Sequence, residues 1–112
     1  MGGETIIIYS PSVRAYLIEL IAILYEKEYF GFEESAHEYV EQIRQSIRTD
    51  LPQEINHHTV PKELKHYGKY YIKIKGSSRT TWYVFFDKMD NRYFIEYITN
   101  NHTPQSAFFN LD

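Results

Sequence analysis

The chain has no cysteine, only five glycines and four prolines, and no long apolar run. Without cysteine it can form neither disulfide bonds nor thiolate metal sites. No apolar stretch approaches the roughly 20 residues that span a bilayer, and no charged leader precedes a short apolar segment with a cleavage site. We therefore expect a cytoplasmic protein without a membrane segment. Its 112 residues fit a single domain.

A strong charge of one sign is also missing from the chain as a whole. The formal net charge is −3 and the pI is about 5.9, whereas nucleic-acid-binding domains are usually basic throughout. The two parts of the chain differ, because residues 1–61 carry four Lys/Arg against ten Asp/Glu and residues 62–112 carry eight against five. A general nucleic-acid binder is therefore disfavoured, but a local basic site in the second part is not.

Aromatic side chains are abundant, with 11 Tyr and 7 Phe, and they favour β-structure. Together with β-branched residues they fill three runs, residues 69–75, 80–87 and 93–99. Gly-Ser-Ser and Lys-Met-Asp-Asn separate these runs, and both are typical of turns. The sequence therefore predicts a three-stranded antiparallel meander.

The first of these strands has two different faces, because side chains at every second position point to the same side. One face is apolar and consists of Tyr70, Ile72 and Ile74. The other carries two cations and consists of Tyr71, Lys73 and Lys75. Arg79 follows across the predicted turn, so a tight hairpin would bring three cations to one patch. Lysines that only protect a strand edge or face solvent are an equally good interpretation of this pattern.

The first half of the chain predicts one strand and two helices. Residues 5–9 form a continuously apolar run, long enough for one buried strand. Ser10 can then cap a helix that begins at Pro11, a position where the missing N–H of proline costs nothing. Apolar stripes at helical spacing predict helices over residues 11–28 and 33–51. A short link joins them, so we expect an αα-hairpin that covers the apolar face of the sheet.

Residues 52–66 have no clear period and contain two prolines. They predict a loop, with a helical turn at residues 61–64. His57 and His58 lie in this loop, where adjacent side chains point in different directions and no third ligand has a recognisable spacing. We therefore expect no metal site.

The predicted element order, β-α-α-β-β-β, defines an α+β domain. Its helical hairpin packs on one face of a small, mainly antiparallel twisted sheet. The first strand is expected at an edge of the meander or beside its last strand. The opposite face is expected to be open and to carry the polar residues Tyr71, Lys73, Lys75 and Arg79.

In this order of elements the chain resembles the RelE/ParE superfamily of toxins from bacterial toxin–antitoxin systems. The resemblance covers nearly the whole length and includes the Pro-opened helical hairpin, the strand Tyr-x-Ile-Lys-Ile-Lys, an Arg before an aromatic strand, and a last strand that ends in a polar turn. It implies one toxin domain over residues 1–112. In that family the ribonuclease branch cuts messenger RNA, mostly on the ribosome, and the ParE branch poisons DNA gyrase. A cognate antitoxin that wraps the toxin silences both.

The resemblance also implies catalytic residues around the predicted hairpin. Lys73, Lys75 and Arg79 match the basic positions of the ribonuclease branch, and His102 stands where some members carry a catalytic histidine. RNA cleavage by the neighbouring 2′-OH needs a base, positive charge on the phosphorane oxygens, and an acid for the leaving 5′ oxygen. Histidine can act as base or acid near neutral pH, and arginine can grip a phosphate with two hydrogen bonds. A turn residue that bonds the backbone is the other interpretation of His102.

Four further residues are candidates for binding the substrate. Tyr71 and Tyr83 offer rings on which splayed bases could stack. Asn100 and Asn101 stand near the end of the last strand, where many ribonuclease members carry an additional Arg.

The leading hypothesis is thus a toxin that acts as an mRNA endonuclease on the ribosome without a cofactor, and that is held by a cognate antitoxin. The alternatives are a non-enzymatic inhibitor that binds DNA gyrase through the same face, and an inactive toxin-fold protein that only binds its partner. A titratable group beside the cations favours the enzyme, because a pure binding protein does not need one.

Overall fold

The structure, a computed structural model, describes residues 4–26, 33–77 and 79–102. They form, in chain order, β1 (Ile6–Tyr9), α1 (Pro11–Glu26), α2 (Glu33–Asp50), the 3₁₀ helix η1 (Glu54–Asn56), β2 (His58–Thr59), the 3₁₀ helix η2 (Lys62–Tyr67), β3 (Tyr70–Ser77), β4 (Thr80–Met89) and β5 (Arg92–Asn100). None of the helices in this part of the chain combines the length and the apolar character needed to cross a lipid bilayer.

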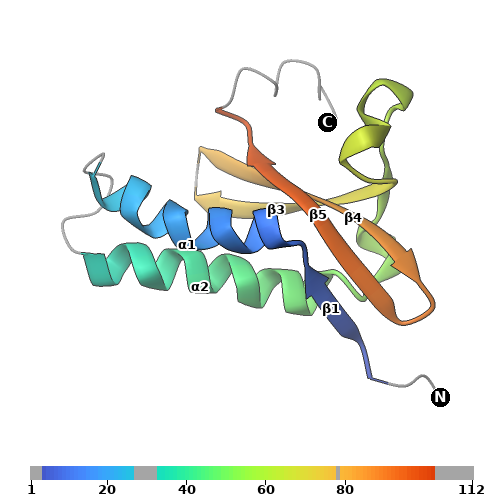
Figure 1. Cartoon of the computed structure of the whole chain (residues 1–112), viewed down its shortest axis with the longest axis horizontal. Coiled ribbons are helices and arrows are strands. Elements are labelled where there is room, and N and C mark those ends of the chain that lie inside the picture. The colour runs from blue at the N-terminus through green and yellow to red at the C-terminus, as the bar shows by residue number, and fades with distance from the viewer. Residues whose placement is uncertain (1–3, 27–32, 78, 103–112) are drawn as a thin grey trace.

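The five strands form one sheet in the order β1-β5-β4-β3-β2. The strands β2 to β5 pair antiparallel, and β1 pairs parallel with β5. The predicted α+β fold is therefore confirmed, including a first strand that lies at an edge beside the last one. Figure 1 shows α1 and α2 side by side along the sheet, where α1 contacts β5 and α2 contacts β3.

The start of α1 has the predicted cap. The Ser10 hydroxyl accepts a hydrogen bond from the backbone N–H of Val13 at 3.2 Å, and Pro11 is the first residue of the helix. This bond satisfies one of the N–H groups that a helix leaves without a partner at its first turn. The predicted end of this helix, residues 27 and 28, lies outside the described residues.

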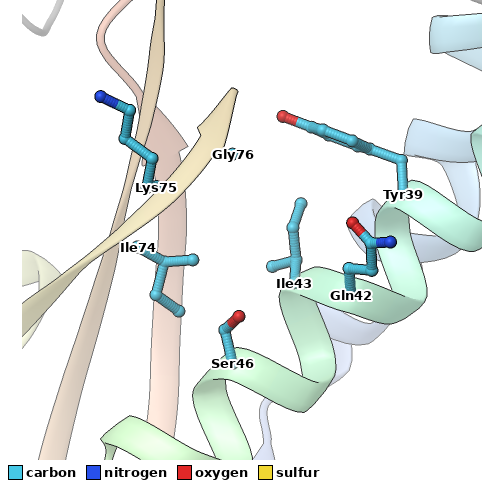
Figure 2. Close-up of a pocket in the computed structure, with 7 residues that line it drawn as sticks. All are labelled: Tyr39, Gln42, Ile43, Ser46, Ile74, Lys75 and Gly76. Atoms are coloured by element: carbon cyan, nitrogen blue, oxygen red, sulfur yellow. The ribbon is translucent and has the colours of Figure 1, made fainter. Parts of the chain in front are cut away.

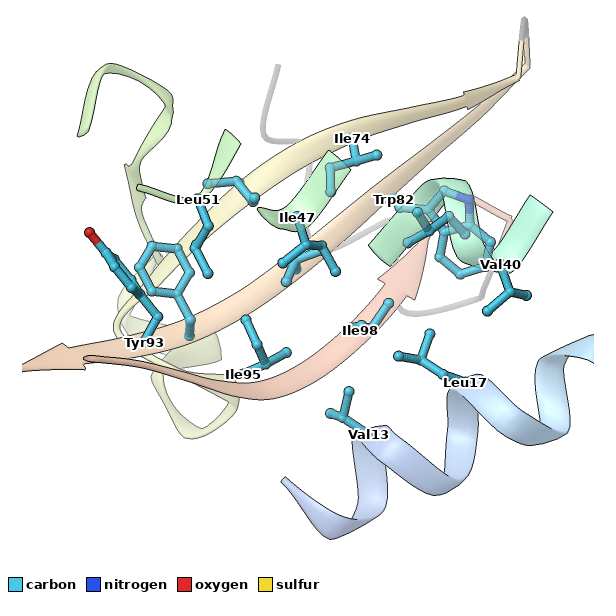
Figure 3. Close-up of a cluster of buried hydrophobic side chains, with 14 of the residues drawn as sticks. Val13, Leu17, Val40, Ile47, Leu51, Ile74, Trp82, Tyr93, Ile95 and Ile98 are labelled. Atoms are coloured by element: carbon cyan, nitrogen blue, oxygen red, sulfur yellow. The ribbon is translucent and has the colours of Figure 1, made fainter. Parts of the chain in front are cut away.

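The main core lies between the helices and the sheet (Figure 3). Three helical residues of α1, namely Val13, Leu17 and Leu20, face the sheet there. The core residues of α2 are Val40, Ile43 and Ile47, and Leu51 follows directly after the helix. The strands contribute Ile72, Ile74, Trp82, Val84, Phe86, Tyr93, Ile95 and Ile98. The predicted apolar face of β3 is thus the one that the helical hairpin covers.

The opposite face of the sheet is not open along its whole length, contrary to expectation. Val60 and Leu64 pack with Tyr71, Tyr83 and Phe85 in a second buried cluster. The segment predicted as a loop therefore covers part of this face, and it contains two 3₁₀ helices and the short strand β2, which pairs with β3. The pieces are too short to produce a periodic pattern in the sequence, although 3₁₀ turns of this length are common connectors.

The prediction that the first strand is buried is also wrong. Ile6 and Ile8 are 42% and 40% exposed, whereas Ile7 and Tyr9 pack against the main core. The helices cover only one face of the sheet, so alternate residues of this edge strand remain exposed on the other. A continuous apolar run does not by itself distinguish an edge strand from a central one.

Gly76 lies in β3 beside Tyr39 of α2. The pairing of β3 with β4 shifts between Lys75 and Ser77, which makes Gly76 the extra residue of a bulge. Beside it, the Trp82 indole N–H donates a hydrogen bond of 2.9 Å to the Tyr39 hydroxyl, which reaches from α2 toward Gly76 (Figure 2). A Cβ atom at position 76 would lie 2.3 Å from that hydroxyl oxygen and 2.5 Å from the indole nitrogen.

We predict that Gly76→Ala destabilises the fold by about 1–3 kcal/mol, because the added methyl forces Tyr39 and Trp82 apart in a closely packed site. Chemical denaturation of the variant and of the wild type measures this loss. In Gly76→Ala/Tyr39→Phe the loss should be smaller than the sum of the two single losses, because one of the clashing atoms is gone. A Gly76→Ala protein as stable as the wild type would contradict this account of the bulge.

Candidate functional site

The ends of β3 and β5 lie beside the start of β4 at the β3–β4 hairpin. Asn101, which follows β5, is hydrogen-bonded to β4 and to the hairpin. Its backbone N–H donates to the Thr81 carbonyl at 3.1 Å. Its side-chain oxygen accepts from the Thr81 N–H at 3.0 Å, and its amide nitrogen donates to the Arg79 carbonyl at 3.1 Å. Asn101, predicted to bind substrate, therefore fixes the backbone on which Arg79 is carried.

His102 follows and is anchored at two points. Its backbone N–H donates to the side-chain oxygen of Asn100 at 2.8 Å. Its ring nitrogen Nε2 lies 3.0 Å from the Thr80 hydroxyl, which can donate or accept according to the histidine tautomer. The ring thus bonds a side chain, not the backbone as the turn interpretation supposed. The imidazole is exposed and hydrogen-bonded to Thr80.

The two lysines lie on the face of β3 that points away from the helices. Lys75 pairs with Thr81 and Lys73 with Tyr83, so these four side chains share that face. Figure 2 shows Lys75 pointing away from Tyr39 and α2. Lys75 is exposed and Lys73 is half-buried.

The histidine and the lysines approach the hairpin end from different sides. Thr80 immediately precedes Thr81, so its side chain points to the side of Trp82, which faces the helices. His102 is bonded to Thr80 and therefore lies toward that side, whereas Lys73 and Lys75 lie on the other. Arg79 is exposed in the turn between them. The structure thus places five of the predicted site residues at one end of the sheet, namely Lys75, Arg79, Asn100, Asn101 and His102. Lys73 lies two residues before Lys75 on β3, further from this end.

Tyr71 and Tyr83, predicted as stacking surfaces, belong to the second buried cluster. They are only 3% and 7% exposed. The ring of Tyr71 stacks on His58, with ring centres 4.9 Å apart and planes at 23°. Because both rings are buried, neither is accessible for stacking with a base. Tyr71 and Tyr83 are core residues in this structure.

His58, which the sequence offered only as a possible metal ligand, is a titratable group close to Lys73. It pairs with Tyr71, so it lies on the same face as Lys73, the next residue but one along β3. Partial burial lowers the pKa of His58, and the nearby charges of Lys73 and His57 lower it further. The pairing of β2 with β3 creates this proximity, and nothing in the local sequence indicates it.

The adjacent His57 has a different role. Its ring nitrogen Nε2 lies 2.6 Å from the Leu51 carbonyl just past α2, and its ring meets Phe86 edge-on at 4.9 Å. His57 therefore contacts the helix-facing core while His58 contacts the second cluster. Within residues 4–26, 33–77 and 79–102, no group of three or more His, Asp or Glu side chains is placed to hold a metal ion.

A small cleft of about 60 Å³ lies between α2 and β3, behind Lys75. It is lined by Tyr39, Gln42, Ile43, Ser46, Ile74, Lys75 and Gly76 (Figure 2). Sites for drug-sized ligands occupy about 300–1,000 Å³. The cleft is thus too small to enclose a nucleotide.

We predict that Lys73→Met raises the pKa of His58 toward the ordinary histidine value, because it removes a nearby positive charge that opposes protonation. Titration of the His58 ring protons by NMR measures the shift. Lys62→Met, which removes an exposed lysine of η2, is the control and should leave the His58 pKa nearly unchanged. An unaltered titration in Lys73→Met would mean that the lysine does not act on His58.

Comparison of the chain with protein-family models, with curated proteins and with solved structures gives no match. A fold alone does not determine function. The arrangement of the residues at the hairpin end must therefore carry the functional interpretation.

Proposed function

We propose that this protein is a toxin of the RelE/ParE kind and that it cleaves messenger RNA at the β3–β4 hairpin end. Its support is the element order of the family together with one observation: Lys75, Arg79 and a hydrogen-bonded His102 occur at the same end of the sheet. Cations and an oriented imidazole are the groups that RNA cleavage by an internal hydroxyl requires.

In the proposed reaction the 2′ oxygen of one nucleotide attacks the adjacent phosphorus, and the bond from phosphorus to the 5′ oxygen breaks. The 2′ hydroxyl gives its proton to a base, and the departing 5′ oxygen receives a proton from an acid. The products are a 2′,3′-cyclic phosphate and a 5′ hydroxyl, and no cofactor takes part. Arg79 and Lys75 would stabilise the charge that develops on the phosphorane oxygens.

His102 would carry one of the two proton transfers. Its Nε2 bond to Thr80 and its backbone bond to Asn100 hold the ring in place before the substrate arrives, which reduces the cost of orienting it. Because His102 and Lys75 lie toward different sides of the hairpin end, the RNA backbone would have to pass around this end. Lys73 would extend the basic path along the strand.

The proposed substrate and the proposed protein partner are those that the resemblance to the RelE/ParE family implies. Translated mRNA on the ribosome in the bacterial cytoplasm would be the substrate, and a cognate antitoxin would hold the toxin inactive. A helix in a groove or a strand added to a sheet edge is a common mode for such a partner.

We predict that induced expression in a bacterial host arrests growth and produces new mRNA 5′ ends. His102→Ala should reduce the cuts by about 10²- to 10⁴-fold, the usual contribution of a general acid or base. Arg79→Ala should also abolish most of them, because the phosphate loses its bidentate partner. Sequencing of mRNA 5′ ends after induction measures both. His66→Ala and Lys62→Ala remove an exposed histidine and an exposed lysine of η2, away from the hairpin end, and should cut like the wild type.

Two results would overturn the nuclease. Growth arrest with intact mRNA would indicate that the protein acts by binding a target such as DNA gyrase and not by cleaving RNA. The absence of any arrest, with soluble and folded protein, would leave a toxin fold without toxin activity.

A further inference from the structure

His58 is an exposed aromatic ring that stacks on a buried one. The short strand β2 pairs with β3 so that His58 stands opposite Tyr71, and the two rings stack with centres 4.9 Å apart and planes at 23°. Tyr71 is 3% exposed, whereas His58 is an exposed residue. The stack therefore covers one face of the imidazole, and the exposed side chain can present its other face to a ligand.

The same face of the sheet carries the two lysines of β3. Lys73 and Lys75 follow Tyr71 at every second position, so along the strand they lie about 7 Å and about 13 Å beyond the pair of Tyr71 with His58. The partners of the two lysines on β4, a tyrosine and a threonine, are uncharged. An exposed ring thus stands at one end of a short basic row, and the β3–β4 hairpin lies at the other.

A ring beside a row of cations is an arrangement by which proteins bind single-stranded nucleic acid, because the cations contact phosphates while bases stack on the ring. We propose that His58 stacks on a base of the RNA, whose backbone runs from the hairpin end along Lys75 and Lys73. This inference rests on the proposed function, since it continues the path of the RNA away from the cleavage site. Tyr71 supports the stacking ring from below and does not contact the base itself.

The distance of His58 from the hairpin end makes it a binding residue and not a catalytic one. About 13 Å of extended strand separates its partner Tyr71 from Lys75, and His102 lies toward the other side of the hairpin end. A group that transfers a proton must come within about 3 Å of the reacting oxygen. His58 and His102 are too far apart to act on one phosphate, so the stacked base belongs to a nucleotide away from the cleaved bond.

Near neutral pH the positive charge of this face comes from its lysines. Partial burial lowers the pKa of His58 from the ordinary value of 6.5, and the charges of Lys73 and His57 lower it further, so the ring is neutral. A lysine on a phosphate releases counterions from the RNA, whereas a neutral ring on a base does not. Loss of His58 and loss of Lys75 should therefore change RNA binding in different ways.

Fluorescence anisotropy with a labelled single strand of about ten nucleotides tests the stack at neutral pH. The strand is 2′-O-methyl RNA, which cannot be cleaved by an internal hydroxyl. His58→Ala should weaken binding about 5- to 100-fold, the usual loss for one stacking ring, with the salt dependence of the wild type. His58→Phe keeps a ring and should bind like the wild type.

Two further variants serve as controls for charge and for position. Lys75→Met should lower the slope of log affinity against log salt concentration by about 0.7, the contribution of one phosphate contact on a single strand. His37→Ala removes an exposed histidine of α2, which lies on the other side of the sheet, and should bind like the wild type.

A strand without bases tests the stack with no change in the protein. An abasic strand of the same length keeps its phosphates but offers nothing to stack on a ring. The difference in affinity between the wild type and His58→Ala should therefore vanish on this strand. A loss that came from a damaged fold would persist on both strands.

The outcomes separate this inference from the proposed nuclease. If the wild type binds the normal strand and His58→Ala binds it equally well, the stacking surface is wrong and the nuclease is unaffected. A wild type that binds neither strand, or a His58→Ala loss that is the same on the abasic strand, also overturns the stacking. Binding that depends on His58 in a chain that produces no new mRNA 5′ ends would support the stacking surface and overturn the nuclease.

Discussion

The burial of β4 on both faces is the constraint on which the rest of the structure depends. Its five consecutive residues from Trp82 to Phe86 are at most 7% exposed. Trp82, Val84 and Phe86 pack under the helices, and Tyr83 and Phe85 pack under the segment that contains η1, β2 and η2. One strand thus joins two apolar clusters, so the helical hairpin and the covering segment are both held in place by the same backbone. Burial of several large side chains in this way contributes on the order of 1.5–3 kcal/mol each.

The candidate site lies where this burial ends. Thr80 and Thr81 are only half-buried, and from there outward the sheet is held by polar contacts of Asn100, Asn101 and His102 with the backbone and with Thr80. Hydrogen bonds of this kind give less free energy than apolar burial but impose a direction. The described residues of the hairpin end are therefore accessible and are still joined by directed hydrogen bonds, as a site on a rigid scaffold requires.

The parts that the sequence predicted correctly are those with a strong local signal. The alternation of β3 separates Ile72 and Ile74 from Lys73 and Lys75, and the Ser10-Pro11 pair marks the start of α1. The parts that it missed depend on contacts between distant segments. Val60 and Leu64 meet Tyr71 and Tyr83 only in the folded chain, and His58 reaches Lys73 only because β2 pairs with β3. A short irregular segment has no period from which such pairing can be inferred.

The distribution of charge limits how an anionic ligand can approach. The outer side of α2 carries the exposed Glu38 and Glu41 together with the exposed Arg44 and Arg48, so these charges balance, whereas Lys75 and Arg79 are exposed at the hairpin end. The hairpin end therefore attracts a polyanion more strongly than this side of α2 does, although the chain as a whole is net negative. The neighbouring cleft is too small to enclose a nucleotide. An extended strand that crosses the exposed end of the sheet is therefore a better match to this surface than a small phosphorylated molecule.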